Sequence, residues 1–474
     1  MVSDGSDNVL LLTFAELSHS LGGEVISFGS AGTVDAGTAG FSSVSVDSRA
    51  VREGALFAAL PGSERDGHSF VEEAFKNGAA AALVERRKLE TGGLLRAAKN
   101  GGKTLIAVND TLQGLQDAAG AYLEKFPRLV KVGVTGSSGK TTTKEIAAAI
   151  IGAEKKVVMN PGNYNSETGL PLAVFAVRPW HEVGIFEMGM NRKGEIKALA
   201  SVLKPDIALI TNVGSAHIGI LGSKEAIAEE KKEIFSRFTG NCTALIPVDS
   251  DYRDFLAEGL PGRVVFFGGK LFADLGGVRD LGLDGSEITW AGERIRFALP
   301  GRHNLADAFA AIAIALEIPV SGNAVRQGLE SVKPLFGRGE IIRGPVTVLR
   351  DCYNANPESL AEAVEFCESL DWPGRRVYVI GEMLELGENS RPAHEGIGRL
   401  LSSSKADKVF LFGKETEAAA DQISGEARFF HTCDIDELSK ALEAYLHSGD
   451  FVLIKGSRGC ALERLSGVLE GRAA

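Results

Sequence analysis

Cysteine is scarce in this sequence: five residues are spread over 474 positions, and no two of them form a CxxC pair. Five scattered cysteines exclude a disulfide framework and are typical of reduced thiols in a cytosolic protein. The chain also lacks an excess of basic residues, since 51 Lys and Arg stand against 62 Asp and Glu, which gives a net charge of -11. This balance argues against a protein that binds extended nucleic acid.

Long apolar runs are missing as well. No run approaches the roughly 18 residues that are needed to cross a bilayer. The first segment, MVSDGSDNVLLLTF, lacks the basic stretch of an export signal. We therefore expect a cytoplasmic protein with no membrane span, and the acidic charge is compatible with a soluble monomer. Hydrophobic residues make up 44% of the chain, a composition that excludes disorder as the main state.

Strand-like and helical segments alternate along the chain and predict an α/β protein of three domains. We expect a small N-terminal α/β domain over residues 1–108 and a central domain with a mostly parallel sheet over 109–336. A Rossmann-like, doubly wound domain is expected over 337–474. Residues 268–296 are rich in glycine and are expected to form a looser β excursion.

The strongest motif is VGVTGSSGKTTTKE, in which a predicted strand runs into a glycine loop and then a helix. Glycine lets backbone N–H groups close around phosphate oxygens, Lys140 can reach the terminal phosphates, and the Thr141 hydroxyl can bind Mg²⁺. The usual spacing requires glycine where this chain has Val134, so this is a variant P-loop, and a plain structural turn is the alternative. The central domain is therefore predicted to be an ATPase domain, with ATP bound by Gly136, Ser137, Ser138, Gly139, Lys140, Thr141 and Thr142.

Two further residues follow strands of the same domain. Glu187 ends the apolar strand VGIFEMG, and His217 follows the strand in IALITNVGSAH. Both are expected at the carboxyl edge of the sheet, where doubly wound proteins bind ligands. They are candidate Mg²⁺ ligands, and the alternatives are a solvated charge for Glu187 and a loop or capping role for His217.

Five strings occur in an order that resembles the ATP-dependent Mur ligases: TGSSGKTTTKE, NPGNYNSETGLPL, EMGMNRKGEI, TNVGSAHIGILGSKEAIAEEKKEIF and PGRHNLADAFAAIA. The likeness runs from about Val44 to Arg464. The C-terminal strings DCYNANPESL, GEMLELGENS and VLIKGSRG are most similar to the member that joins D-Ala-D-Ala to UDP-N-acetylmuramoyl-tripeptide. Ligases that add single amino acids, and folylpolyglutamate synthetases, share the central motifs but lack DCYNANP and GEMLELG.

The resemblance implies that ATP converts a carboxylate to an acyl phosphate, which an incoming amine attacks through a tetrahedral intermediate, releasing ADP and phosphate. It implies catalytic roles for Lys140 on the phosphates, for Glu187 with Thr141 at Mg²⁺, and for His217 at a second metal. Lys231 matches a family lysine that CO₂ carbamylates and that then binds metal. The resemblance also implies ATP contacts by Asn304, Arg338 and Asp351, contacts to the nucleotide-sugar peptide by Asn163, Asn165 and Thr168, and contacts to the uridine end by Ser48 and Arg49.

Asn354 and Asn356 are plausible partners of the incoming dipeptide, and Lys455 and Arg458 could hold carboxylates. The alternatives are turn formation for the asparagines and a solvated loop for the basic residues. Because the expected ATP groups of the third domain lie beyond the P-loop domain, we expect a hinge near 333–339, and Gly337→Pro should impair turnover more than ATP binding.

Two departures from the family pattern stand out. Glu382 occupies a position where Asp is expected, and residues 86–102 are interpreted as a surface insertion. The sequence leaves open whether the third residue of the tripeptide is meso-diaminopimelate or L-lysine. It also leaves three rivals: another amide ligase of the family, a kinase or simple NTPase, and a non-catalytic nucleotide-binding protein.

Overall fold

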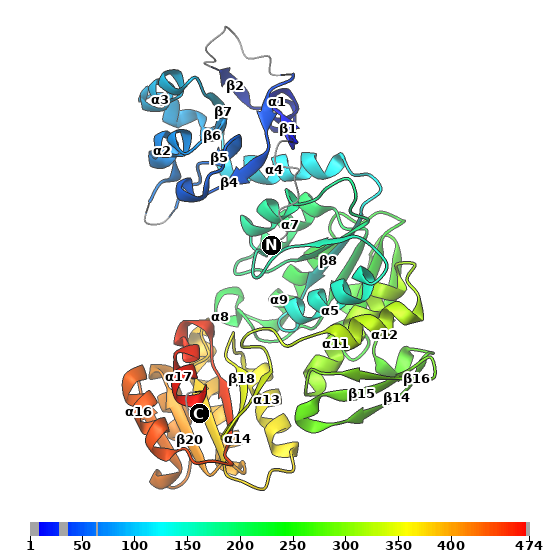
Figure 1. Cartoon of the computed structure of the whole chain (residues 1–474), viewed down its shortest axis with the longest axis vertical. Coiled ribbons are helices and arrows are strands. Elements are labelled where there is room, and N and C mark those ends of the chain that lie inside the picture. The colour runs from blue at the N-terminus through cyan, green and yellow to red at the C-terminus, as the bar shows by residue number, and fades with distance from the viewer. Residues whose placement is uncertain (1–8, 28–36, 63–64, 471–474) are drawn as a thin grey trace. The chain divides into compact units, whose positions relative to one another are not determined.

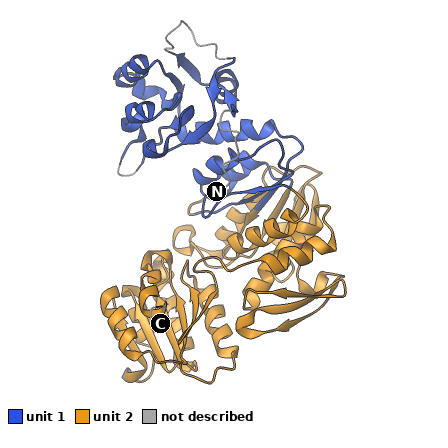
Figure 2. Cartoon of the chain, viewed as in Figure 1, with its two compact units in different colours: residues 1–133, 156–190, 195–206 blue, residues 134–155, 191–194, 207–474 orange. Residues whose placement is uncertain are grey.

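The computed structural model describes residues 9–27, 37–62 and 65–470. The chain divides into two compact units (Figure 2), one of residues 1–133, 156–190 and 195–206, the other of residues 134–155, 191–194 and 207–474. Three large sheets, each with helices between its strands, confirm the α/β class (Figure 1). Within the described ranges no helix is both long and apolar enough to cross a membrane. Residues 1–8, part of the segment inspected for an export signal, lie outside the described residues.

The first sheet has five strands in the order β2-β7-β6-β5-β4. β2 is antiparallel to β7, and the other neighbours are parallel. The strands are β2 Glu24–Ser27, β4 Ser43–Ser45, β5 Ala55–Ala58, β6 Ala81–Glu85 and β7 Thr104–Val108. A two-stranded pair, β1 Leu12–Thr13 and β3 Gly40–Phe41, and four helices accompany them: α1 Phe14–Leu21, α2 Val71–Lys76, α3 Gly93–Gly101 and α4 Thr111–Glu124.

The interpretation of residues 86–102 as a surface insertion is wrong. These residues connect β6 to its parallel neighbour β7, and a parallel pair needs a crossover that returns the chain to the same end of the sheet. The crossover contains α3, whose Ala98 is fully buried in a core with Val84 and Leu105. The segment is therefore an integral part of this sheet.

The central sheet has the order β13-β12-β11-β8-β10-β9, and the pairs β9–β10, β11–β12 and β12–β13 are parallel. Its strands are β8 Val130–Thr135, β9 Val157–Met159, β10 Val183–Glu187, β11 Ile207–Ile210, β12 Thr243–Pro247 and β13 Arg263–Phe267. The helices are α5 Lys140–Gly152, α6 Gly169–Val174, α7 Glu195–Leu203, α8 Ile218–Leu221, α9 Lys224–Lys232, α10 Arg253–Ala257, α11 Arg302–Leu316 and α12 Gly322–Ser331. The expected β excursion is confirmed as an antiparallel sheet of β14 Leu275–Asp280, β15 Ser286–Trp290 and β16 Glu293–Phe297.

The C-terminal sheet has the order β17-β18-β22-β19-β20-β21, in which only β17 is antiparallel to its neighbour. Val377 and Val452 face one core, while Tyr378 and Leu453 face the other, so central strands are buried on both sides. This confirms the doubly wound prediction. The strands are β17 Glu340–Arg343, β18 Thr347–Asp351, β19 Arg376–Gly381, β20 Lys408–Phe412, β21 Phe429–Thr432 and β22 Phe451–Lys455; the helices are α13 Pro357–Ser369, α14 Ser390–Ser403, α15 Glu417–Ala420, α16 Ile435–Tyr445 and α17 Ser466–Glu470.

Candidate active site

The phosphate loop connects β8 to α5, as the motif predicts. Gly139 precedes α5 with a left-handed φ of 77°, and an added Cβ there would lie 2.0 Å from Asp307 Oδ1. An added Cβ at Gly136 would lie 1.7 Å from Thr211 Oγ1. Crowding therefore requires glycine at both positions, although their spacing departs from the usual P-loop pattern.

Asn212, the second residue after β11, braces this loop. Its Oδ1 accepts hydrogen bonds from the N–H groups of Ser137 (3.1 Å) and Ser138 (3.0 Å), and its Nδ2 donates to Ser138 Oγ (2.9 Å). Thr211 Oγ1 donates to Ser138 O at 2.6 Å. Two N–H groups of the loop that were expected to face phosphate are thus bound by a side chain. Asn212 was not predicted, although a polar pair that follows a fully buried strand was a usable signal.

The expected phosphate lysine begins α5, and its Nζ donates to Gly136 O at 2.9 Å, while Thr141 beside it is buried. Asp307 of α11 lies against the loop, where it accepts a hydrogen bond from Thr143 Oγ1 at 3.4 Å. Burial raises the pKa of Asp307 well above its usual range, and the charge of Glu362 adds to the shift. Asp307 was also missed, although an acid inside the apolar run ADAFAAIAIAL is unusual.

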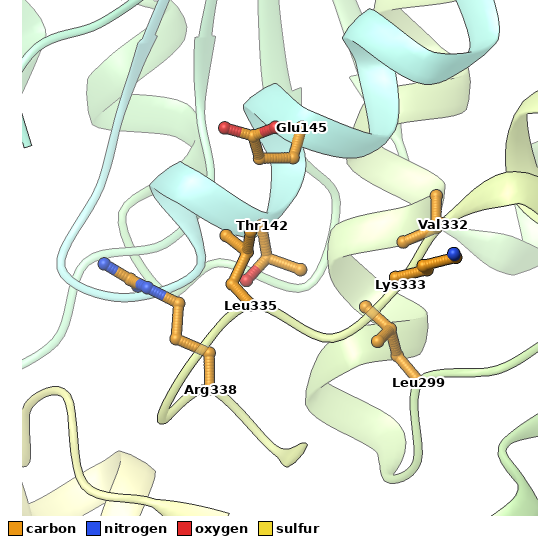
Figure 3. A pocket seen from close by; sticks show the side chains of 7 residues that line it. All are labelled: Thr142, Glu145, Leu299, Val332, Lys333, Leu335 and Arg338. Atoms are coloured by element: carbon orange, nitrogen blue, oxygen red, sulfur yellow. The ribbon is translucent and has the colours of Figure 1, made fainter. Parts of the chain in front are cut away.

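A small pocket lies beside the first turns of α5 (Figure 3). Thr142 and Glu145 reach it from α5, and the segment 332–338 lines it from the side of the expected hinge. Two expected ATP residues, Thr142 and Arg338, therefore line one pocket, with Glu145, Leu299, Val332, Lys333 and Leu335.

Asn304, expected at the adenine, lies in the first turn of α11 and is only 4% exposed. Its Nδ2 donates to Pro300 O at 2.7 Å. An added Cβ at Gly339 would lie 3.2 Å from that nitrogen, so Asn304 contacts the end of the expected hinge.

Lys231 of α9 is only 1% exposed. Burial lowers its pKa well below the usual range, the charge of Lys140 lowers it further, and Glu230 opposes the shift. A neutral amine is thereby favoured, and carbamylation requires that form. The solvent-facing lysine that would have argued against modification is not observed.

His217 precedes α8 with a left-handed φ of 65°, and its Nδ1 lies 2.6 Å from Glu385 Oε2. Glu385 belongs to the GEMLELG string, and its contact with the imidazole ring lowers the pKa of its carboxyl. The Gly219 N–H donates to Glu385 O at 3.1 Å. The expected metal histidine is thus turned toward a carboxylate. In the part of the chain that the structure describes, no group of three or more His, Cys, Asp or Glu is arranged to hold a metal ion.

Glu187 lies in the other unit, at the end of β10, and is 2% exposed. Asn165 Nδ2 donates to its Oε1 at 2.6 Å, and Asn160 Oδ1 accepts its N–H at 2.9 Å. Asn165, expected at the peptide substrate, therefore orients the expected metal carboxylate. Of the other two residues expected at that substrate, Asn163 is exposed and Thr168 is half-buried beside α6.

Asp351 and Lys455 are register partners on the parallel strands β18 and β22. Lys455 Nζ donates to Asp351 Oδ2 at 2.5 Å, and the lysine is 2% exposed. Asp351 was expected to bind the ribose of ATP, and Lys455 was expected to hold a carboxylate of the dipeptide. The structure pairs them.

The ring of Tyr353 stacks against two expected ligand-binding arginines. The Arg338 guanidinium lies 3.9 Å and that of Arg458 5.8 Å from the ring centre. Arg458 also pairs with Glu463 at 2.7 Å and remains exposed. Tyr353 was not predicted, although it stands inside the DCYNANP string.

The two asparagines of this string differ. Asn354 is exposed, whereas Asn356 is the N-cap of α13: its Oδ1 accepts the Ser359 N–H at 2.8 Å, and Pro357 follows as the first helical residue. For Asn356 the turn-forming alternative is therefore observed.

The two residues of the first domain that were expected to bind the uridine end differ in their exposure to solvent. Ser48 is buried, and its hydroxyl donates to Glu73 Oε2 at 2.8 Å. Arg49 is exposed and pairs with Asp47, which lowers the pKa of that carboxyl to about 2. Only Arg49 presents its side chain to solvent.

Glu382 points back into its own domain: its Oε2 accepts the Glu415 N–H at 3.1 Å.

Taken together, a phosphate loop on a mostly parallel sheet, in a chain that also contains a doubly wound domain, defines a nucleotide-binding α/β protein. Three family models match it in chain order: "Mur ligase family, catalytic domain" over residues 41–122, "Mur ligase middle domain" over 134–315 and "Mur ligase, glutamate ligase domain" over 337–458. The chain belongs to the Mur ligase family.

The similarity extends over the full length of named relatives. A UDP-N-acetylmuramoyl-tripeptide--D-alanyl-D-alanine ligase of Treponema pallidum is 46% identical over 97% of this chain and 99% of that protein. The crystal structure of MurF from Acinetobacter baumannii has a TM-score of 0.85 at 26% identity and covers 97% of this chain and 98% of its own. The MurF ligase of Thermotoga maritima in complex with ADP has a TM-score of 0.77 at 31% identity, covering 91% and 97% of the two chains.

Proposed function

We propose that this chain is an ATP-dependent ligase that joins D-Ala-D-Ala to UDP-N-acetylmuramoyl-tripeptide. The products are UDP-MurNAc-pentapeptide, ADP and phosphate, and the reaction is a cytoplasmic step of peptidoglycan synthesis. The observation that carries this proposal is the full-length similarity to the Treponema pallidum ligase of that name. The three domains are assigned to the UDP end, to ATP and to the dipeptide, in chain order, with boundaries at 108 and 336, and the enzyme acts as a monomer.

The reaction needs ATP because an amine does not displace hydroxide from a carboxylate at a useful rate. A carboxylate oxygen of the tripeptide attacks the γ-phosphorus, and ADP leaves. The dipeptide nitrogen then attacks the acyl carbon, and the resulting tetrahedral intermediate expels phosphate. Bringing the carboxylate to the γ-phosphate creates repulsion, which Lys140 and the N-terminus of α5 offset.

Mg²⁺ fits the donor chemistry, because a buried carboxylate at Glu187 and a buried hydroxyl at Thr141 are hard oxygen ligands. We assign His217 and a carbamate on Lys231 as the other ligands. Mg²⁺ would neutralise charge on the phosphates. The carbamate forms when the neutral Nζ of Lys231 attacks CO₂ and loses one proton, so the buried lysine becomes an anionic oxygen donor.

The decisive experiment is an ADP-release assay with ATP, Mg²⁺ and UDP-MurNAc-tripeptide, with and without D-Ala-D-Ala. We expect ADP release that depends on the dipeptide, with pentapeptide product found by mass spectrometry. Turnover with a single amino acid alone would favour another ligase of the family. Phosphate release that does not depend on the dipeptide would favour a simple NTPase. A panel with meso-diaminopimelate and L-lysine tripeptides determines the third residue.

A further inference from the structure

Glu358, in the first turn of α13, binds a segment that is far away in sequence. Its Oε1 accepts the Ser215 N–H at 3.1 Å, and its Oε2 accepts the Ser215 hydroxyl at 2.6 Å. Lys224 Nζ lies 2.9 Å from the same Oε1. Both carboxylate oxygens are thus used by residues that precede α13 by more than a hundred positions.

The segment that receives Glu358 also holds the phosphate loop. The Gly214 N–H donates to Ser137 Oγ at 2.8 Å, and that hydroxyl donates to Gly214 O at 3.2 Å. Two residues earlier, Asn212 binds the N–H groups of Ser137 and Ser138. A continuous chain of hydrogen bonds therefore runs from the phosphate loop through residues 212–215 to the start of α13.

At its other end, this series of hydrogen bonds reaches α13, close in sequence to residues expected to bind ATP and the dipeptide. α13 directly follows the DCYNANP string, in which Asp351 ends β18 and Asn356 caps the helix. The position of the helix therefore sets the position of that string. A glutamate in the first turn of a helix is favourable by itself, but this does not explain why both its oxygens bind Ser215.

We propose that Glu358 is a positioning residue that ties α13 to the phosphate loop through Ser215 and Gly214. It thereby couples the bound triphosphate to the placement of the amine substrate. The proposal rests on the proposed ligase function. Glu358 touches no reacting group, and its effect is on alignment.

The kinetic test compares Glu358→Ala with Glu365→Ala, an exposed glutamate on the same helix. Losing charged hydrogen bonds should lower kcat by about tenfold or more, while the Kd for ADP from calorimetry changes by less than about threefold. Glu358→Gln keeps an acceptor for Ser215 and should recover part of the rate. Glu358→Ala with kcat equal to that of Glu365→Ala would overturn the proposal, and so would an equal loss in ADP affinity.

A double variant tests whether Glu358 acts through Ser215. Ser215→Ala removes the hydroxyl bond to Glu358 but keeps the N–H bond, so it should reproduce part of the loss. Ser215→Ala combined with Glu358→Ala should be no slower than Glu358→Ala alone, because the hydroxyl bond is already lost in Glu358→Ala. Independent, multiplying effects would contradict coupling through Ser215. Should Glu358→Ala fail to fold, Ser215→Ala and Glu358→Gln carry the same test.

Hydrogen exchange gives a readout that does not need ligase activity. In nucleotide-free protein, Glu358→Ala should speed exchange in a peptide covering 211–217 by about tenfold, with β19 unchanged. Unchanged exchange there would reject the contact. If instead the wild-type chain shows no dipeptide-dependent ADP release while the exchange result holds, the proposed function fails and the tie between α13 and the loop segment stands.

Discussion

The ammonium group of Lys455 lies 2.5 Å from the carboxylate of Asp351, on neighbouring parallel strands. Both were expected to bind substrates, yet each has the other as a partner. A buried ion pair of this kind either serves stability alone or holds one partner in place for a ligand, and the two roles predict different variant behaviour.

Lys455→Met should destabilise the protein by about 2 kcal/mol, because it leaves the half-buried Asp351 without its partner. If Lys455 also holds the dipeptide carboxylate, the KM for D-Ala-D-Ala should rise by about tenfold or more. Thermal unfolding and steady-state kinetics measure both, with the exposed Lys440→Met as the matched control. A loss of stability with unchanged KM values would leave Lys455 a purely structural residue.

Lys231→Ala should abolish ligase activity, and formate, acetate or bicarbonate should restore part of it by supplying the missing anionic oxygen. The buried position of Lys231 and its lowered pKa favour the neutral amine that CO₂ attacks. Intact-mass or ¹³C NMR measurements with ¹³CO₂ should detect the carbamate in wild type and lose it in the variant. A fully active Lys231→Ala enzyme would remove this residue from the site.

Asn212→Asp should weaken ATP binding by about tenfold. Aspartate can still accept the N–H groups of Ser137 and Ser138, but it cannot donate to Ser138, and it adds a negative charge near the triphosphate. Calorimetry with a non-hydrolysable ATP analogue measures the loss, and the exposed Asn241→Asp serves as the control. Equal affinities for the two variants would mean that the loop does not depend on Asn212.

Asp307 predicts a pH dependence of stability. Its folded pKa lies well above the unfolded value of 3.8, because burial disfavours the charge. Its contribution is therefore fully present below about pH 3.8 and is lost as pH rises through the folded pKa. Asp307→Asn should flatten this loss, so its melting temperature relative to wild type should increase from pH 5 to pH 8. The exposed Asp371→Asn should show no such trend. A constant difference across that range would contradict the raised pKa.

At Gly337, substitution by alanine tests the expected hinge more sharply than substitution by proline. Its φ is 68°, and the φ of proline is fixed near about -65°, so Gly337→Pro would distort the segment before any hinge motion is tested. Gly337→Ala and the control Gly259→Ala, whose φ is 72°, should each lose about 1 kcal/mol of stability. Only Gly337→Ala should lower kcat while ADP binding is retained. Matching kinetics in both variants would argue against a hinge at this glycine.

The larger features of the fold could be predicted because they depend on local patterns. Continuous apolar strands such as VGIFEMG and VYVIGEM require burial on both faces, and the GSSGKTT loop requires a strand before it and a helix after it. The crossover at 86–102 was misread because the family likeness suggested surplus residues, whereas the sheet needs a connection there.

The site could be predicted only in part. Residue types indicate which groups a side chain can bind, but not which neighbouring residue binds it in the folded protein. Tertiary packing pairs Lys455 with Asp351 and His217 with Glu385. Asn356 instead caps its own helix, α13. Asn212 and Glu358 stand inside the TNVGSAH and DCYNANPESL strings, but their bracing role could not be predicted, since it depends on contacts across long sequence separations.

The crossover that contains α3 limits how the molecule can be trimmed. β6 spans five residues, about 17 Å, so a direct link from its end to β7 could only make a hairpin. Shortening the chain by excising 86–102 would therefore reverse β7 and misalign β2 beyond it. Protein engineers who want a smaller variant should leave this stretch intact.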